Sequence, residues 1–495
     1  MTGTAPGPAP IDPEKVQGIV LRGYRMPFAR HFALSVNDVG AARTFLAGLV
    51  GDDPDWPHIT SAAFWGPVKP DYCVNVGFTY PGLQALGVPS ASLAGFNTYH
   101  HLPFLNGSAA SSATVGDIGA SAPTTPWKVD DRDFHVMLSL FAHSFPILEL
   151  QSGRLEHRFG AAFDGGAPTF DCQALPDDEV YFGYRDNIAQ PIIAGMQLFS
   201  RNQQGSQPLT DPGAFMLGTA TTTYFQMVPV PDPPAFGLYG CFGAFRMLEQ
   251  DVDGFAAEVD HLKGQMAQAP FNVTDPEVQR LALKAKMCGR WPNGQPLARY
   301  PVNGNTPAPA VLRPEELNDF NYVLPDGDPT QPPATDPDTG TNVPIGCHIR
   351  RGNSRDFPYA NPSENHRIMR RAMPYQFPYT PETPDGGERG LMGFFLSATL
   401  KGQFEFVQKN WINNGVNGSG FSSVSDPADP LMAATNPTYE TVPLATTGAP
   451  SRNRIQPMSS FVTTRGSAYV FFPGLDGIRF IATPPAAEAT HLAAG

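Results

Sequence analysis

Two histidines and six arginines are concentrated between Gly346 and Tyr379, in the stretch GCHIRRGNSRDFPYANPSENHRIMRRAMPYQFPY. An imidazole can ligate iron, and a guanidinium binds a carboxylate through two parallel hydrogen bonds. His348 and His366 are therefore candidate metal ligands, and the arginines that follow each of them are candidate groups for binding an anion. A solvated basic surface is the alternative, because charged side chains are mostly exposed.

Asp186 is a second candidate for chemistry, within the segment EVYFGYRDNIAQPII at 179–193. It lies between Arg185 and Asn187, directly after an aromatic segment that we expect to end a strand. A carboxylate in such a place can accept and return one proton near a reactive centre. The alternative is an ordinary Asx turn, since Asp and Asn shortly after a glycine are typical turn residues.

The composition limits which ligand these residues could serve. The chain has 495 residues, of which 41% are hydrophobic and 34 are Phe, enough for a large core and two domains of ordinary size. A net charge of −13 argues against general binding to nucleic acid or to an anionic membrane. No run of 18 apolar residues predicts a membrane span. A basic cluster on this background is better suited to one small anionic ligand.

The N-terminal sequence MTGTAPGPAPIDPEK has neither a basic n-region nor an apolar h-region, so we expect no signal peptide and a flexible tail at residues 1–17. The five cysteines are scattered and form no CxxC pair, which favours reduced thiols over zinc or redox chemistry. These features predict a cytoplasmic protein, or one secreted from a processed precursor.

Hydrophobic periodicity predicts a similar order of elements twice. In the first half, the predicted strands and helices are strand 30–36, a helix after Asn37 or Asp38, strand 72–80, a short helix from Pro81, strand 134–142 and helix 145–159. In the second half, they are strand 238–248, helix 252–262, strand 390–397, helix 400–411 and strand 467–472. Two halves, each an antiparallel sheet covered by helices, are the simplest α+β architecture with this order.

These elements predict an N-terminal domain at 18–215, a C-terminal domain at 216–482 and a terminal tail at 483–495, with the join expected within 201–235. The Gly- and Pro-rich segments are interpreted as long loops inserted into this frame: 88–128, 201–235, 295–345 and 413–457.

Five segments resemble, in the right order, motifs of the dye-decolorising peroxidase family. They are DPEKVQGIVLRGYRMPFARHFALSV at 12–36, FGYRDNIAQP at 182–191, LALKAKMCGRWPNGQPL at 281–297, CHIRRGNSR with HRIMRRAMPY within 347–375, and GLMGFFLSATLKGQFEFVQKNW with FVTTRGSAYVFFPG near the C-terminus. The resemblance spans most of the chain outside the inserted loops.

This resemblance implies two ferredoxin-like domains, the second of which binds haem b. It implies that His348 is the proximal iron ligand, that Asp186 is the distal aspartate and that Arg370 is the distal arginine, with Arg371 as the competitor for that last role. It further implies a peroxidase that reduces hydrogen peroxide and, through a ferryl haem intermediate, oxidises a reducing organic substrate such as a dye or a phenolic compound.

The remaining cofactor contacts follow from the same resemblance. Arg355 is a candidate partner for a haem propionate. Phe394, Phe395 and Leu396 share one predicted strand and are expected in the core, with one or more of them against the haem. His366 remains the alternative iron ligand.

The sequence departs from the family pattern at two places. The motif GxxDG reads GYRDN, so Asn187 replaces the last glycine; Asn is the best substitute if this position requires a positive φ. The acidic partner of the proximal histidine is not assigned, since Thr399 occupies the place where an acid is frequent and Glu405 is a second candidate. The alternatives are therefore a haem-binding protein of the same fold with little peroxidase activity, or a structural α+β protein without a cofactor.

Overall fold

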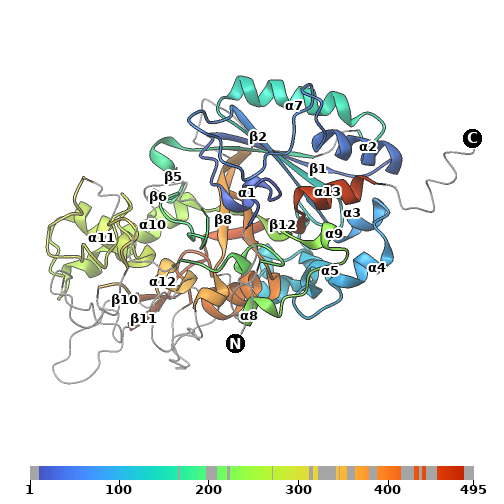
Figure 1. Ribbon diagram of the computed structural model, residues 1–495. Coiled ribbons are helices and arrows are strands. Elements are labelled where there is room, and N and C mark those ends of the chain that lie inside the picture. Colours follow the sequence, from blue (N-terminus) through green and yellow to red (C-terminus); the bar gives the residue numbers. More distant parts are fainter. Residues whose placement is uncertain are drawn as a thin grey trace, which may run out of the picture.

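The computed structural model describes residues 11–165, 168–196, 209–219, 223–269, 271–311, 316–320, 342–344, 346–353, 363–377, 387–413, 428–433, 438–441 and 454–483. An eight-stranded sheet runs through this part of the chain, with helices packed around it (Figure 1). The strands of the sheet are β1 (Phe28–Leu34), β2 (Tyr72–Phe78), β3 (Val136–Ala142), β4 (Thr169–Gln173), β7 (Cys241–Gln250), β8 (Met369–Phe377), β9 (Glu388–Ser397) and β12 (Val462–Phe472).

The order of the strands repeats within the sheet, which reads β4-β1-β3-β2 and then β12-β7-β9-β8. In both halves the fourth strand lies beside the first, the first beside the third and the third beside the second. The neighbouring pairs are antiparallel. This is the ferredoxin-like arrangement, so the predicted α+β class with two such units is confirmed.

The two units are joined more closely than the sequence predicts. Strand β2 of the first pairs with β12 of the second where Phe78 lies opposite Phe471, so that one sheet runs through both. The outermost strands, β4 and β8, also approach each other without pairing. The sheet therefore curls towards a barrel, and its interior holds side chains from both units: His31 of β1 contacts Phe245 of β7 and Phe394 of β9.

The helices of the first unit agree with the predicted pattern. Helix α2 (Val39–Leu49) begins after Asp38, whose carboxylate accepts a hydrogen bond from the backbone N–H of Ala41 at 2.7 Å. Its predicted inner stripe, Ala42, Phe45 and Leu49, is buried. Helix α7 (Phe145–Phe159) has the predicted bounds, and both helices lie on the same side of β1 and β2 (Figure 1).

The second unit differs in detail from the sequence prediction. Strand β7 begins at Cys241 rather than 238, because Tyr239 has a φ of 59°, which a strand does not accommodate. The predicted helix 400–411 consists largely of two π-helical segments, η9 (Leu400–Phe404) and η10 (Val407–Ile412). Such segments are rare and frequently occur at functional sites.

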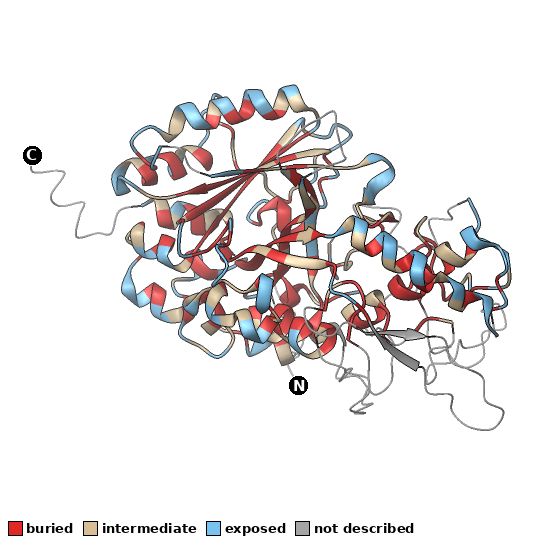
Figure 2. Ribbon diagram, turned by 180° about the vertical axis from the view of Figure 1, so that it is seen from behind, coloured by how far each residue is buried: buried red, intermediate tan, exposed pale blue. Residues whose placement is uncertain are grey.

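Helices α10 (Val252–Leu262) and α11 (Pro276–Cys288) lie to one side of the sheet (Figure 1). They share a second hydrophobic core with Phe182, Trp291 and Cys347, separate from the core around the sheet. Figure 2 shows buried residues running through the sheet and, to one side, through this helical lobe. No helix in the described ranges is long and apolar enough to cross a membrane.

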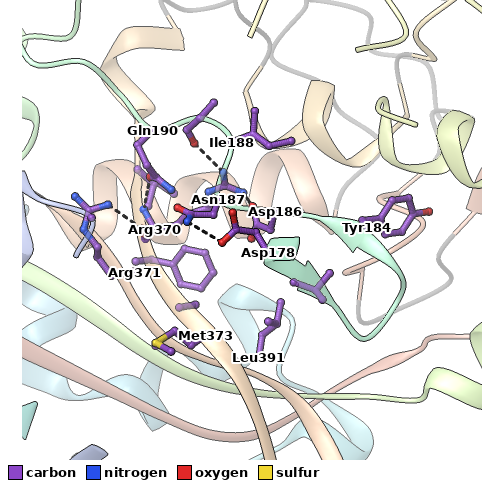
Figure 3. A pocket seen from close by; sticks show the side chains of 18 of the residues that line it. Asp178, Tyr184, Asp186, Asn187, Ile188, Gln190, Arg370, Arg371, Met373 and Leu391 are labelled. Atoms are coloured by element: carbon purple, nitrogen blue, oxygen red, sulfur yellow. Dashed lines mark hydrogen bonds and ion pairs between the residues drawn. The ribbon is translucent and has the colours of Figure 1, made fainter. Parts of the chain in front are cut away.

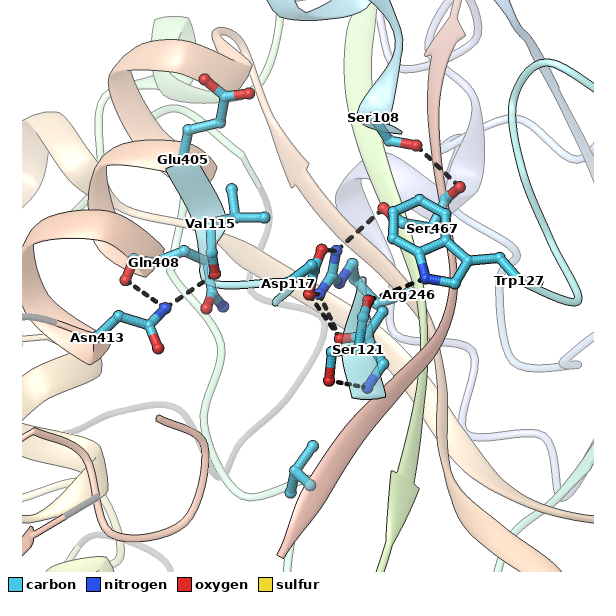
Figure 4. A network of polar contacts seen from close by, with 12 residues as sticks. Ser108, Val115, Asp117, Ser121, Trp127, Arg246, Glu405, Gln408, Asn413 and Ser467 are labelled. Carbon is cyan, nitrogen blue, oxygen red and sulfur yellow. Dashed lines mark hydrogen bonds and ion pairs between the residues drawn. The ribbon is translucent and has the colours of Figure 1, made fainter. Parts of the chain in front are cut away.

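A buried ion pair fastens the insertion between β2 and β3 to the second unit. Asp117, which follows α6 (Ser112–Val115), accepts a hydrogen bond from Arg246 of β7 at 2.6 Å. The same guanidinium donates to Ser467 at 3.1 Å and to Thr464 at 2.8 Å, both on β12 (Figure 4). Both charged side chains are less than one-tenth exposed, so each depends on the other for compensation.

We predict that Asp117→Ala lowers the free energy of unfolding by about 3–5 kcal/mol, because it leaves the Arg246 guanidinium buried without a counter-charge. Asp476→Ala is the matched control: its ion pair with Lys15 is about half exposed and should contribute about 1 kcal/mol or less. Urea denaturation of both variants measures the difference. If the urea midpoint of Asp117→Ala equals that of Asp476→Ala, the buried pair adds no more stability than the exposed pair.

Candidate functional site

A cavity of about 530 Å³ lies between the outer face of β8 and β9 and the α10–α11 lobe. This volume falls in the range of about 300–1,000 Å³ that is usual for cofactor sites. Three sequence-predicted residues from distant segments line it: Asp186, His348 and Arg370. The segment 184–192 forms one wall, and helix α12 (His348–Gly352) forms another.

His348, the first residue of α12, forms a hydrogen bond from Nδ1 to Oδ2 of Asp429 at 2.8 Å. Asp429 is completely buried, and its other carboxylate oxygen accepts the backbone N–H groups of Leu431 and Met432 at 2.8 and 2.9 Å. Because the carboxylate is an acceptor, the imidazole proton is held on Nδ1. Nε2 then carries a free lone pair, and it has no hydrogen-bond partner within the described residues.

Charged groups in different walls of the cavity act on the pKa of His348. Burial disfavours the imidazolium, but the charge and the hydrogen bond of Asp429 outweigh this effect and raise the pKa of His348. Arg370 lowers this pKa and Asp186 raises it through smaller electrostatic interactions. The ring is about one-quarter exposed, and it lines the cavity.

Asp429 is a site residue that the sequence did not reveal. The two candidates for its role have other partners: the Thr399 hydroxyl caps η9 by accepting the Gly402 N–H, and Glu405 accepts a hydrogen bond from Tyr469. The only signal at Asp429 is the dipeptide Asp-Pro, which indicates a turn. The turn is present, since the carboxylate binds two following N–H groups, but its contact with His348 comes from the tertiary structure alone.

Asp186 and Arg370 approach each other on the wall that the segment 184–192 forms with β8. The segment 186–190 follows the hairpin of β5 (Glu179–Val180) and β6 (Tyr184–Arg185), and Arg370 is the second residue of β8. Nη1 of Arg370 lies 3.9 Å from Oδ1 of Asp186. The backbone N–H of Arg370 donates to Gln190 at 3.0 Å and Nη2 donates to the carbonyl of Ala189 at 3.1 Å, which fixes this segment to the strand (Figure 3). Both charged groups are almost half exposed, so they remain accessible to a ligand.

Arg371 points to the other side of β8. Its Nε donates to the carbonyl of Ile19 in α1 (Gly18–Leu21) at 2.8 Å, and its Nη1 donates to the carbonyl of Arg370 at 3.0 Å. Burial lowers its pKa to about 10. Figure 3 shows Arg371 on the far side of Arg370 from Asp186. Of the two arginines that the sequence left open, Arg370 is therefore the one beside the aspartate.

Asn187 adopts a left-handed backbone conformation, with a φ of 57°, which glycine and asparagine accommodate most readily. Its amide donates to Oδ1 of Asp178 at 3.2 Å rather than to Asp186 (Figure 3). The backbone N–H of Asp186 also bonds to the carbonyl of Asp178, at 2.8 Å. The substitution of glycine by asparagine thus preserves the turn and adds a contact that stabilises it.

The basic stretch that opens α12 does not form one anion site. Arg350 donates to the carbonyl of Val343 at 2.7 Å and Arg351 donates to the carbonyl of Trp411 at 2.9 Å. Both arginines are buried and bind backbone instead of lining the cavity. Arg355, the candidate partner for a propionate, lies outside the described residues.

His366 lines the cavity but is tightly packed. Its Nδ1 lies 2.6 Å from the carbonyl oxygen of Gly402, and its ring stacks on Phe406 with centroids 3.7 Å apart. Its Nε2 is enclosed by protein and has no hydrogen-bond partner among the residues that the structure describes. Burial lowers the pKa of His366, which keeps the ring neutral at pH 7.

Only one of the three hydrophobic residues predicted to contact the cofactor reaches the cavity. Phe395 lines it together with Leu391 and Gly393. Phe394 and Leu396 point to the other face of β9, into the interior of the curled sheet, and are completely buried. Successive residues on a strand face opposite sides, so Phe394 and Leu396 belong to the core as expected, and Phe395 is the one of the three that is placed to contact a bound cofactor.

The chain is similar to fungal peroxidases over nearly its whole length, although no family model matches it. It is 27% identical over 514 residues to a dye-decolorizing peroxidase of Mycena epipterygia, covering 95% of this chain and 87% of that protein. It is also 27% identical over 488 residues to peroxidase 2 of Mycetinis scorodonius, covering 94% and 86%.

Solved structures give the same result for the fold. An ancestral D-type dye-decolorizing peroxidase superposes with a TM-score of 0.77 and 26% identity, over 96% of this chain and all of that chain. A dye-decolorizing peroxidase in complex with 2,6-dimethoxyphenol superposes with a TM-score of 0.77 and 24% identity, over the same shares of the two chains.

The left-handed conformation at position 187 leads to a stability prediction. Asn187→Val should lower the free energy of unfolding by about 1–2 kcal/mol, because a side chain with a branched Cβ is strained at a positive φ. Asn187→Gly, the control, removes the strain as well as the contact with Asp178 and should change stability by about 0.5 kcal/mol or less. Thermal unfolding compares the two. If both variants melt like the parent, the turn does not constrain this residue.

Proposed function

This chain belongs to the dye-decolorising peroxidase family and is a haem peroxidase. From this premise we propose that its cavity binds haem b, with His348 on one face of the haem and Asp186 and Arg370 on the other. The observation that carries the proposal is the pair of His348 and Asp429. A ligating imidazole characteristically donates its other ring proton to a carboxylate, and the free Nε2 of His348 adjoins a cavity of suitable size.

The residues fit haem in three respects. His348 supplies an imidazole with a fixed tautomer for the iron, whereas Nε2 of His366 is enclosed. Phe395 and Leu391 give the cavity an apolar wall for the porphyrin. Arg367 lines the same cavity as a cation that attracts a propionate, and Arg355 is proposed as a further partner.

Haem, when bound, supplies the iron at which hydrogen peroxide is reduced and holds the two oxidising equivalents that this reduction leaves. Asp429 strengthens the electron donation of His348 by accepting a hydrogen bond from its Nδ1–H. Asp186 takes a proton from one peroxide oxygen and returns it to the other. Arg370 lies beside Asp186 and donates hydrogen bonds to the negative charge that develops as the O–O bond breaks.

The electron donor is proposed to be an aromatic compound of the phenol or dye class. One structural relative was solved in complex with 2,6-dimethoxyphenol, and this chain covers all of that protein. The donor supplies two electrons, one at a time, and these electrons remove the two oxidising equivalents. The alternative of a haem-binding protein with little activity rests on the departure at Asn187, and the unchanged turn at this residue weakens it.

The ligand assignment leads to a prediction about haem retention. His348→Ala should fold but lose most of its haem, because the bond between iron and imidazole is the strongest single anchor in the proposed site. His366→Ala should retain haem, since its Nε2 is enclosed. The Soret absorbance per mole of purified protein measures both variants. The opposite result, with haem lost only in His366→Ala, would reverse the assignment.

The distal pair leads to a prediction about the reaction with peroxide. Arg370→Leu should slow the peroxide-dependent change in haem absorbance by about 10²–10³-fold, the usual effect of removing one preorganised donor. Asp186→Asn should slow the same step, because an amide does not take up the peroxide proton. Stopped-flow absorbance measures both rates.

Arg371→Leu is the control for this experiment. It removes the hydrogen bond to Ile19 and should reduce stability while leaving the rate with peroxide near that of the parent. If Arg371→Leu is slow and Arg370→Leu is as fast as the parent, the roles of the two arginines are exchanged. If the parent itself does not react with peroxide, the proposed function is wrong.

A further inference from the structure

Tyr469 and Glu405 form a buried pair of phenol and carboxylate that the proposed reaction does not use. The Tyr469 hydroxyl donates to Oε1 of Glu405 at 3.0 Å. Tyr469 is 1% exposed and Glu405 is 6% exposed. A buried carboxylate at hydrogen-bond distance from a buried phenol is also a base that can receive the phenolic proton.

The surroundings keep Glu405 available as an acceptor. It lies at the junction of η9 and η10, near the polar network of Figure 4. Arg246, a buried cation whose charge acts on Tyr469, is bound to Asp117. Glu405 also accepts a hydrogen bond from the Ser111 side chain, and Lys401 and Lys409 act on it only through the electrostatic field.

Aromatic rings connect this pair to the cavity. The ring of Phe404 meets that of Tyr469 edge to face, with centroids 6.2 Å apart. On its other side Phe404 contacts Phe395, with centroids 5.4 Å apart. Phe395 lines the cavity, so Tyr469 lies two ring contacts behind the proposed haem site.

We propose that Tyr469 is a redox-active tyrosine that stores one oxidising equivalent close to the haem when no organic donor is bound. This inference rests on the proposed function, which supplies the oxidant. Tyr469 gives one electron to the oxidised haem centre, and the O–H bond of the phenol breaks as its proton moves to Glu405. The products are a neutral tyrosyl radical and a protonated Glu405. An electron from a donor and the proton from Glu405 later restore the phenol.

The protonation equilibria of the pair agree with this coupled transfer. Burial, together with the negative charge of Glu405, raises the pKa of Tyr469 well above its ordinary value, so the phenolate is not available for oxidation. The proton must therefore leave with the electron. Burial also raises the pKa of Glu405, which makes this carboxylate a stronger base for the proton.

Tyr375 provides an internal comparison. Its hydroxyl also donates to a glutamate, Glu388, at 3.2 Å. Glu388 is bound by Lys128 at 2.7 Å, so its negative charge is already compensated and it is a weaker proton acceptor. Tyr375→Phe thus removes a buried phenol of the same kind without removing the proposed radical site.

Electron paramagnetic resonance tests the inference on full-length, haem-loaded protein, frozen rapidly after mixing with hydrogen peroxide without an organic donor. The parent should give a radical signal that narrows when the protein is labelled with ring-deuterated tyrosine. Tyr469→Phe should lose this signal and Tyr375→Phe should retain it. Soret absorbance and thermal unfolding of each variant report whether haem and fold are intact.

Glu405→Gln separates proton transfer from packing, and it decides the question if Tyr469→Phe does not fold. The amide still accepts a hydrogen bond but does not take up the proton, so the signal should be lost. A signal that persists in Tyr469→Phe, or is absent from a parent that reacts with peroxide, overturns the inference and leaves the proposed function intact. A signal that persists in Glu405→Gln overturns the role of Glu405. A parent that shows no change in haem absorbance on adding peroxide overturns both proposals.

Discussion

Side chains on a strand point alternately to opposite faces of a sheet, and this constraint decides which residues of β8 and β9 meet the cavity. Arg370 lies directly opposite Phe395 in the register of the two strands, and both line the cavity. Arg371 lies opposite Phe394; it binds the carbonyl of Ile19 on the other side of β8, where Phe394 packs against His31. A shift of the register by one residue would exchange a distal cation for a buried one. The curled sheet prevents this shift, because its interior faces are filled by the aromatic residues of both units.

The two walls of the cavity differ in the way that charge is held. On the side of α12, a completely buried carboxylate is fixed by two backbone N–H groups and in turn fixes the His348 ring. On the other side, Asp186 and Arg370 are almost half exposed and 3.9 Å apart, a pair that contributes little to stability. A ligating ring needs a single orientation, whereas groups that bind and release a small substrate need access. This difference between the two walls supports the proximal and distal roles that we propose for them.

Sequence patterns predicted the parts of this structure that depend on local periodicity. The amphipathic spacing in α2 and α10 and the alternation in the strands led to the doubled order of elements, and motif residues led to Asp186, His348 and Arg370. Contacts between distant segments carried no such signal. Asp429 is recognisable only as a turn residue, and the binding of the Trp411 carbonyl by Arg351 depends on where a segment 60 residues further along the chain passes. The joining of β2 to β12 is likewise a tertiary feature without a local pattern.

The pairing of β2 with β12 also has a consequence for the order in which the chain can fold during synthesis. Phe78 belongs to the first sixth of the sequence, whereas Phe471 is near its end. The end of β2 at Phe78 consequently lacks its partner until almost the whole polypeptide has left the ribosome, whereas Val74 and Val76 of the same edge are already bonded to Thr60 and Gln17. An uncovered edge strand is a template for pairing with other chains. Since the partner edge is tethered to the same molecule, its local concentration is high once it is made, and the correct pairing is favoured over association with a neighbour.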